Sequence, residues 1–232
     1  MNVLAVGCHP DDLEIGCGGT LARYAAEGHT VTYCHVADGS VGHTVILPEE
    51  LRVIRACEAR QAADVLNASY VSLGIPDLEV NAKDLEVVKR MVTVIRAAAP
   101  DIIITHSPED YMKDHVEVSH LVFDASFSAS VPHFGEGAAC AIAPLYYMDT
   151  LAGIGFLPTE YVDISETVDT KLAALACHDS QIAWMREHDK IDFLNFVRAC
   201  AMFRGIQCGA GYAEGFRPCM TFPRMTAKRL LP

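Results

Sequence analysis

The chain begins with the apolar segment NVLAVG (residues 2–7), which is followed directly by CHPDD (residues 8–12). A short apolar run bounded by glycine is typical of a strand that is buried on both faces. The polar residues after it fall at the carboxyl end of that strand, where open α/β sheets bind their ligands. This stretch therefore predicts both a parallel sheet and the position of a functional site.

Over the next hundred residues, segments typical of helices and strands alternate. Residues 20–27 are good helix formers that end at Gly28, and residues 30–36 are β-branched and aromatic, which favours a strand. The same criteria predict helices over residues 48–66, 84–99 and 115–129 and strands over residues 69–73 and 101–105. This alternation predicts a doubly wound, mostly parallel α/β sheet flanked by helices, with Rossmann-like topology and right-handed crossovers.

The regular alternation of helical and strand-like segments ends at about residue 131. Strand-like segments follow at residues 144–148 and 161–164, and helical ones at residues 165–177 and 181–202. No internal repeat, low-complexity run or linker separates the two halves. We therefore expect a single domain over residues 1–232, with an α/β core (1–130) and a C-terminal extension (131–232) packed on it.

Composition narrows the class of protein. A hydrophobic fraction of 51% and a charged fraction of 21% are ordinary globular values. The formal net charge of −12 repels nucleic acid and anionic membranes, so we expect a small-molecule substrate and neither of those partners. No apolar run approaches the roughly 20 residues of a membrane helix, and the apolar start is too short for a secretory signal.

The cysteines bear on the redox environment. There are nine, an odd number, and they are scattered singly without any CxxC pair. This pattern is typical of reduced thiols, and it predicts a cytoplasmic protein.

The cluster after the first strand has the residue types of a catalytic metal site. Zinc takes imidazole and carboxylate ligands, and a catalytic site uses three protein ligands and leaves a position for water. His9 and Asp12 can supply two of them. Because Pro10 restricts the turn, Asp11 and Asp12 can point in different directions, and an acid held off the metal can take a proton from activated water.

A third ligand has to come from another part of the chain. The strand predicted at residues 101–105 leads into a polar segment, and in a doubly wound sheet its carboxyl end can lie beside that of the first strand. The residues alone leave four candidates open, namely His106, Asp110, Asp114 and His115.

Together these features resemble the LmbE-like (PIG-L) N-deacetylases, zinc enzymes that remove acetyl groups from N-acetylglucosamine-type amides. The resemblance is carried by HPDDLEIGCGGT (residues 9–20) and continues through shorter matches at residues 38–39, 54–59, 77, 114–115 and 178–181. It implies a metal-dependent hydrolase that cleaves the N-acyl, typically N-acetyl, amide of a small sugar-like substrate. It is also compatible with a homo-oligomer.

The resemblance also implies roles for individual residues. Zinc would be bound by His9, Asp12 and His115, with Asp11 as the catalytic base. Arg55 and Asp77 would contact the substrate. Because imidazole and carboxylate also suit iron, cobalt and manganese, Zn²⁺ is the expected cofactor with other divalent metals as alternatives.

One position departs from the family pattern. The family usually has a histidine three residues before the last ligand, where it helps to stabilise the oxyanion, and here that residue is Met112. A thioether donates no hydrogen bond, and loss of one oxyanion donor costs on the order of 10²–10³ in rate. Replacement donors could be Tyr111, Lys113, His133 or His178, and Asp114 and His178 could contact the oxyanion or the ligands.

Met112 therefore keeps two alternatives open, an amidase for a non-sugar or non-acetyl substrate and a metal-binding homologue with little turnover. Retention of Asp11 favours an enzyme, because a site that only binds metal has no use for a free base. Three of the residues named above could instead have a purely structural role. Arg55 could pair with Glu58 on a helix surface, Asp77 could be a turn residue, and His178 could cap a helix.

Overall fold

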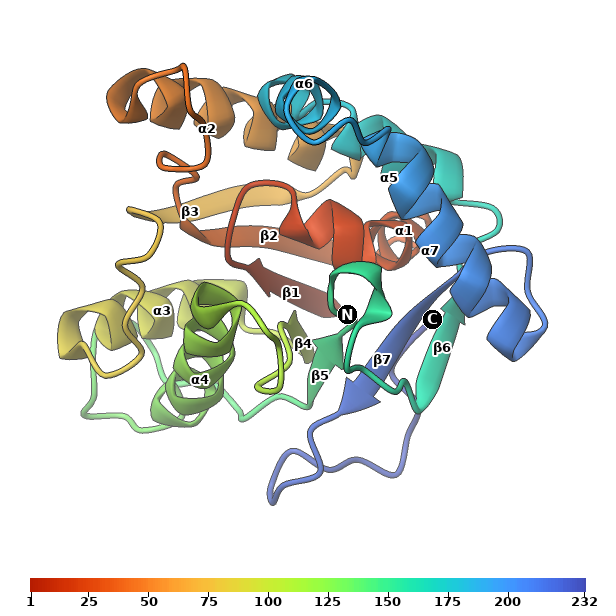
Figure 1. Cartoon of the computed structure of the whole chain (residues 1–232). Helices are drawn as coiled ribbons and strands as arrows, with labels where there is room; N and C mark the ends of the chain where they lie inside the picture. The colour runs from red at the N-terminus through yellow and green to blue at the C-terminus, as the bar shows by residue number, and fades with distance from the viewer.

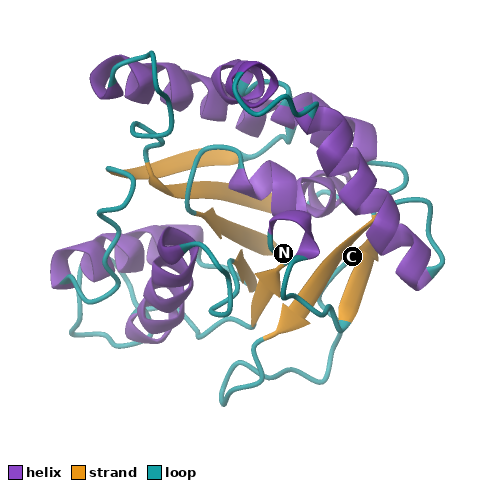
Figure 2. Ribbon diagram, in the orientation of Figure 1, coloured by secondary structure: helices purple, strands orange, loops and turns teal.

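A computed structural model describes all 232 residues. Its centre is a seven-stranded sheet with the order β3-β2-β1-β4-β5-β7-β6 (Figures 1 and 2). Neighbouring strands from β3 to β5 are parallel, and β7 is antiparallel to both β5 and β6. The strands are β1 (Asn2–Gly7), β2 (Thr30–Ala37), β3 (Ser69–Ile75), β4 (Ile102–Thr105), β5 (Leu145–Met148), β6 (Glu160–Asp163) and β7 (Ala213–Pro218).

Helices cover both faces of the sheet (Figure 1). Helices α1, α2, α5 and α7 contribute to the hydrophobic core on one face, and α3 and α4 to the core on the other. The helices are α1 (Asp12–Ala26), α2 (Pro48–Val65), α3 (Leu85–Ala98), α4 (Lys113–Ser128), α5 (Val168–Leu175), α6 (Asp179–Glu187) and α7 (Phe193–Cys208), with a 3-10 turn η1 (Leu151–Gly153). None of them combines the length and the apolar character that crossing a bilayer requires.

Strand β1 is buried on both faces, as its sequence predicts. Val3 and Ala5 belong to one core, and the alternating Leu4 and Val6 belong to the other. Because side chains alternate across a strand, such a run is apolar throughout only where both faces are covered. The α/β fold with a mostly parallel sheet is therefore confirmed.

Helix α1 begins eight residues before the helix expected at residues 20–27, because it includes a glycine-rich turn that helix propensity disfavours. The glycines allow close packing that a side chain would prevent. A Cβ on Gly19 would lie 2.7 Å from Cδ1 of Ile164. Tertiary packing at this turn thus outweighs local propensity.

A buried ion pair forms hydrogen bonds with the backbone of α1. Lys171 of α5 and Glu214 of β7 lie 2.5 Å apart with almost fully buried side chains. Glu214 accepts hydrogen bonds from the Gly19 and Thr20 amides at 2.9 and 2.8 Å, and Lys171 donates to the Ile15 carbonyl at 2.8 Å. The pair therefore joins three elements that are distant in the sequence.

The second half of the chain adds β5, β6 and β7 to the same sheet, so the sheet continues across residue 130. Strand β7 is an element for which no prediction was made from the sequence. One local expectation was wrong, because the helix expected over residues 181–202 is divided into α6 and α7. The loop between them ends at Asp192, which accepts from the Asn195 amide and so begins a new helix.

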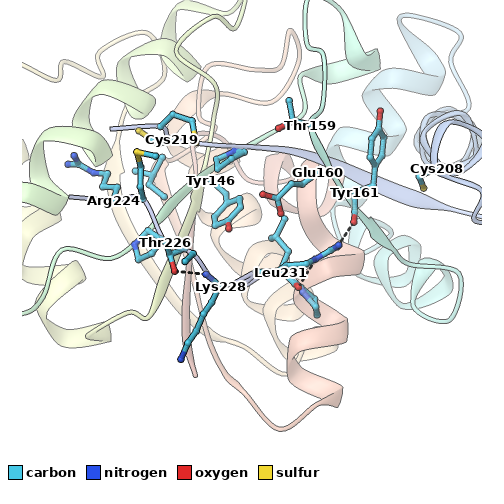
Figure 3. A pocket seen from close by; sticks show the side chains of 18 of the residues that line it. Tyr146, Thr159, Glu160, Tyr161, Cys208, Cys219, Arg224, Thr226, Lys228 and Leu231 are labelled. Carbon is cyan, nitrogen blue, oxygen red and sulfur yellow. Dashed lines mark hydrogen bonds between the residues drawn. The ribbon is translucent and has the colours of Figure 1, made fainter. Parts of the chain in front are cut away.

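A cavity of about 1110 Å³ lies beside the C-terminal segment and the strands β5 and β6 (Figure 3). Tyr146, Glu160 and Tyr161 line it from the strands, and Thr226 and Lys228 from the C-terminal segment, where the Lys228 amide donates to Thr226 Oγ1 at 3.1 Å. It contains no cluster of metal-ligating side chains. Histidines and aspartates from the segments that follow β1 and β4 line a different cavity.

Candidate active site

The parallel pairing of β1 with β4 brings two polar segments together. Val6 at the end of β1 is in register with Thr105 at the end of β4, so the loops that follow these strands are neighbours. His9 lies in the first loop and His106 in the second. The second loop continues into α4, whose first turn carries His115.

Asp12, the first residue of α1, is the centre of this cluster. Its Oδ2 atom lies 3.4 Å from Nδ1 of His9, 3.3 Å from Nε2 of His115 and 3.3 Å from Nε2 of His106. Potential ligand atoms lie within 4.8 Å of one another in two groups, Cys8-His9-Asp12 and Asp12-His106-His115. Asp12 belongs to both groups, whereas the other two ligands expected from the sequence are divided between them, His9 in the first and His115 in the second.

His115 has the features of a metal ligand. Its Nδ1 lies 3.1 Å from Oδ2 of Asp110, while its buried Nε2 has no hydrogen-bond partner and faces Asp12. Metal-binding histidines commonly bond a carboxylate through one ring nitrogen and the ion through the other. This unpartnered nitrogen, the adjacent carboxylate and a second imidazole together form a donor set that suits zinc.

The charges of the cluster favour a bound cation. Although burial opposes ionisation, the neighbouring His115 holds the pKa of Asp12 well below its ordinary value. Burial would also lower the pKa of His115, but Asp12 and Asp110 outweigh it and raise that pKa to about 9. The site therefore attracts positive charge to Nε2, either a proton or a metal ion that competes for the same lone pair.

Asp11 is held close to the cluster in an unusual conformation. It is the N-cap of α1 with φ 115°, and its buried side chain lines the same cavity as His9 and Asp12. Burial raises its pKa to about 6, while Arg55, whose Nη2 lies 3.4 Å from Oδ2, acts in the opposite direction. A carboxylate of this kind can take up and release a proton near neutral pH.

Arg55 and Asp77 both line this cavity, and both hold its backbone in place. Arg55 is buried and donates to the carbonyls of Pro10 and Gly39 at 3.0 and 3.1 Å. Asp77 accepts from the amides of Gly39 and Val41 at 2.8 and 2.9 Å. Their positions are compatible with substrate contact, and their hydrogen bonds show that they also fix the loop after β2.

Asp114 contacts His9, with Oδ2 3.4 Å from its Nε2. His178 is fully buried outside the cavity lining, with Nε2 3.1 Å from Oε1 of Glu14. Met112 does line the cavity. The donors considered as substitutes for the family histidine, Tyr111, Lys113, His133 and His178, do not line it.

His106 is one of the four residues that the sequence offered as the third metal ligand, but the family resemblance gives it no role. Its ring stacks on that of His115 with 3.9 Å between centroids, and its Nε2 accepts from the Cys8 amide at 2.9 Å. Burial lowers its pKa to about 4, so the ring is neutral. Its position immediately after a core strand was the signal that could have identified it.

The cavity has a volume of about 430 Å³, and both charged and apolar side chains line it. Arg55 is the only lysine or arginine that lines it, whereas five aspartates do, namely Asp11, Asp12, Asp77, Asp149 and Asp189. Apolar side chains line the remainder, including Ile15, Met148, Leu151, Met185 and Phe193. Such a cavity favours a neutral substrate and a product that is neutral or positively charged.

Comparisons with known proteins identify the relatives of this chain. A family model described as PIG-L, GlcNAc-PI de-N-acetylase, matches residues 4–126. The chain is 31% identical to a diacetylchitobiose deacetylase of Thermococcus kodakarensis over 226 residues, which cover 93% of this chain and 82% of the relative.

Two solved structures are similar over nearly the whole chain. N,N'-diacetylchitobiose deacetylase from Pyrococcus horikoshii has a TM-score of 0.80 at 28% identity, covering 94% of this chain and 83% of that one. GalB, the 4-carboxy-2-hydroxymuconate hydratase of Pseudomonas putida, has a TM-score of 0.83 at 25% identity and covers 99% and 100%. The likeness thus extends well beyond the residues that the family model matches.

Proposed function

The chain belongs to the PIG-L family of de-N-acetylases, and from this premise we propose that it hydrolyses the N-acyl amide of a small glucosamine-type sugar. The observation that carries the proposal is the buried, unpartnered Nε2 of His115 facing Asp12, with Asp11 held beside them. The reaction breaks the amide C–N bond. The water oxygen goes to the acyl carbon, and the nitrogen gains a proton and leaves as an amine.

In this proposal His9, Asp12 and His115 hold one divalent ion, with zinc as the first choice because imidazole and carboxylate ligands suit it. When bound, such an ion supplies a Lewis acid for the amide carbonyl and lowers the pKa of water toward 7. Asp110 supports the site because its hydrogen bond to Nδ1 fixes the ring of His115.

Asp11 serves as the proton carrier. Its carboxylate accepts the proton of the attacking water and returns it to the leaving nitrogen. Arg55 positions this carboxylate, because the guanidinium that contacts Asp11 is itself anchored to the Pro10 and Gly39 carbonyls. Asp77, on the same side of the cavity, would accept hydrogen bonds from sugar hydroxyls through its remaining lone pairs.

Hydration of an unsaturated acid is a second candidate, favoured by the likeness to GalB over the full length of both chains. The charges of the cavity argue against it. Five aspartates line the cavity, and the one guanidinium is already committed to backbone carbonyls and Gln181. A substrate with several carboxylates would be repelled by like charge, so amide hydrolysis is the better fit.

The test is acetate release by the metal-loaded protein from N-acetylglucosamine and N,N'-diacetylchitobiose, run beside an absorbance assay with 4-carboxy-2-hydroxymuconate. We expect acetate and a free amine in equal amounts, and no loss of the unsaturated acid. Consumption of the unsaturated acid without acetate release would replace the amidase proposal with a hydratase.

A further inference from the structure

The two ends of the active-site cavity lie on opposite sides of the metal-ligand cluster. The sheet order places β2 and β3 on one side of β1 and β4, and β5 on the other (Figure 1). Asp77 follows β3, so the end of the cavity that its carboxylate lines, here called the polar end, lies toward those strands. The apolar Val41 and Leu78 also line it. Met148 ends β5 and Leu151 follows it, so the apolar end lies on the far side of the ligands.

The apolar end adjoins a second cavity of about 280 Å³. Ile15, Gly16 and Asp149 line both cavities. Met148 packs at this junction, where a Cβ on Gly16 would lie 2.6 Å from its Sδ atom. Because methionine is flexible and fills irregular spaces, its side chain can adjust to a group that extends from one cavity into the other.

The second cavity is suited to an apolar group. Helix α7 contributes apolar side chains to its lining, namely Phe196, Val197, Ala199, Cys200, Ala201 and Phe203. Its charged side chains are already paired within the protein. Lys171 contacts Glu214 at 2.5 Å, and Nε of Arg204 contacts Asp149 at 2.6 Å. No unpaired charge therefore opposes entry of a hydrocarbon chain.

We propose that the β5 end of the site is an acyl-chain subsite, formed by Ile15, Met148, Leu151, Met185 and Phe193, which selects N-acyl groups longer than acetyl. This inference rests on the proposed amide hydrolysis, because an amide carbon placed at the ligands directs its two substituents to opposite ends of the cavity. The sugar occupies the polar end beside Asp77, and the acyl chain points toward Leu151. An acetyl group would leave most of the apolar surface uncovered.

The test measures kcat/KM of the metal-loaded protein for glucosamine carrying acetyl, butanoyl, hexanoyl or octanoyl groups. We expect hexanoyl to exceed acetyl by about tenfold or more, since each buried methylene contributes favourably to binding. Leu151→Trp fills the subsite and lowers the hexanoyl-to-acetyl ratio at least tenfold. Leu157→Trp, a change to an exposed residue outside the cavity in the same loop, leaves that ratio unchanged.

Binding of the product acids provides a readout that does not depend on turnover. Calorimetry with hexanoate and acetate should show tighter binding of hexanoate to the wild type, with the difference lost in Leu151→Trp. Hydrolysis of the acetyl compound with no gain from longer chains, and equal binding of both acids, would overturn the subsite and leave the amidase intact.

Two further outcomes distinguish the proposed amide hydrolysis from the proposed acyl-chain subsite. No hydrolysis of any compound, together with tighter hexanoate binding that Leu151→Trp removes, would refute the amidase but retain the apolar subsite. A rate gain from a 4-nitrophenyl aglycone on N-acetylglucosamine, without a gain from longer acyl chains, would assign the apolar end to the aglycone and overturn the acyl proposal.

Discussion

Asp11→Asn is expected to lower kcat for amide hydrolysis by roughly 10²–10⁴-fold, the usual contribution of a general base. Asparagine has nearly the same shape but accepts no proton. It also tolerates positive φ, so the 115° at this N-cap remains accessible, whereas alanine would be strained. The measurement is steady-state acetate release at saturating substrate, with metal content determined on the same sample.

The matched control is Asp124→Asn, which removes an exposed carboxylate from α4 outside the cavity and should leave kcat unchanged. Metal content should be the same in wild type and Asp11→Asn, because Asp11 is not one of the proposed ligands. Wild-type kcat in Asp11→Asn would remove Asp11 as the base. Loss of metal would instead place Asp11 among the ligands.

Lys171→Met is expected to lower the free energy of unfolding by about 3–5 kcal/mol, because it leaves the carboxylate of Glu214 buried without its cation. That carboxylate also holds the Gly19 and Thr20 amides of α1, so the loss weakens the helix that carries Asp12. Urea unfolding followed by circular dichroism measures the change.

A surface pair provides the comparison. Glu86→Gln removes the partner of Lys89 on α3, 2.7 Å away, and should leave the urea midpoint nearly unchanged because solvent screens exposed pairs. The double variant Lys171→Met/Glu214→Gln should recover part of the loss, since the unpaired charge is gone. A change below about 1 kcal/mol in Lys171→Met would show that the pair does not stabilise the fold.

The parts of the fold that follow from local pattern could be predicted. Residues 3–6 and 102–104 are apolar throughout because both faces of these strands are covered, and that pattern is visible in the sequence alone. Parallel pairing of two such strands then placed His9 and His106 in neighbouring loops. The meeting of the HPDD segment with the polar segment after residue 105 was therefore foreseeable.

The remainder depends on contacts between distant parts of the chain. Strand β7 contains Glu214 and Gly215, which have low strand propensity, and its burial comes from pairing with β5 and β6. The first turns of α1 pack and bond against the distant Ile164, Lys171 and Glu214. The apolar end of the cavity could not be predicted either, because it joins the end of β5 to side chains from α6 and α7.

The most direct test of the proposed metal centre is metal content measured by mass spectrometry on wild type, His115→Ala and His120→Ala. His120 is exposed on the same helix and is the matched control. We expect about one divalent ion per chain in wild type and His120→Ala, and none in His115→Ala, with acetate release lost in parallel. Undiminished metal in His115→Ala would contradict the proposed metal centre.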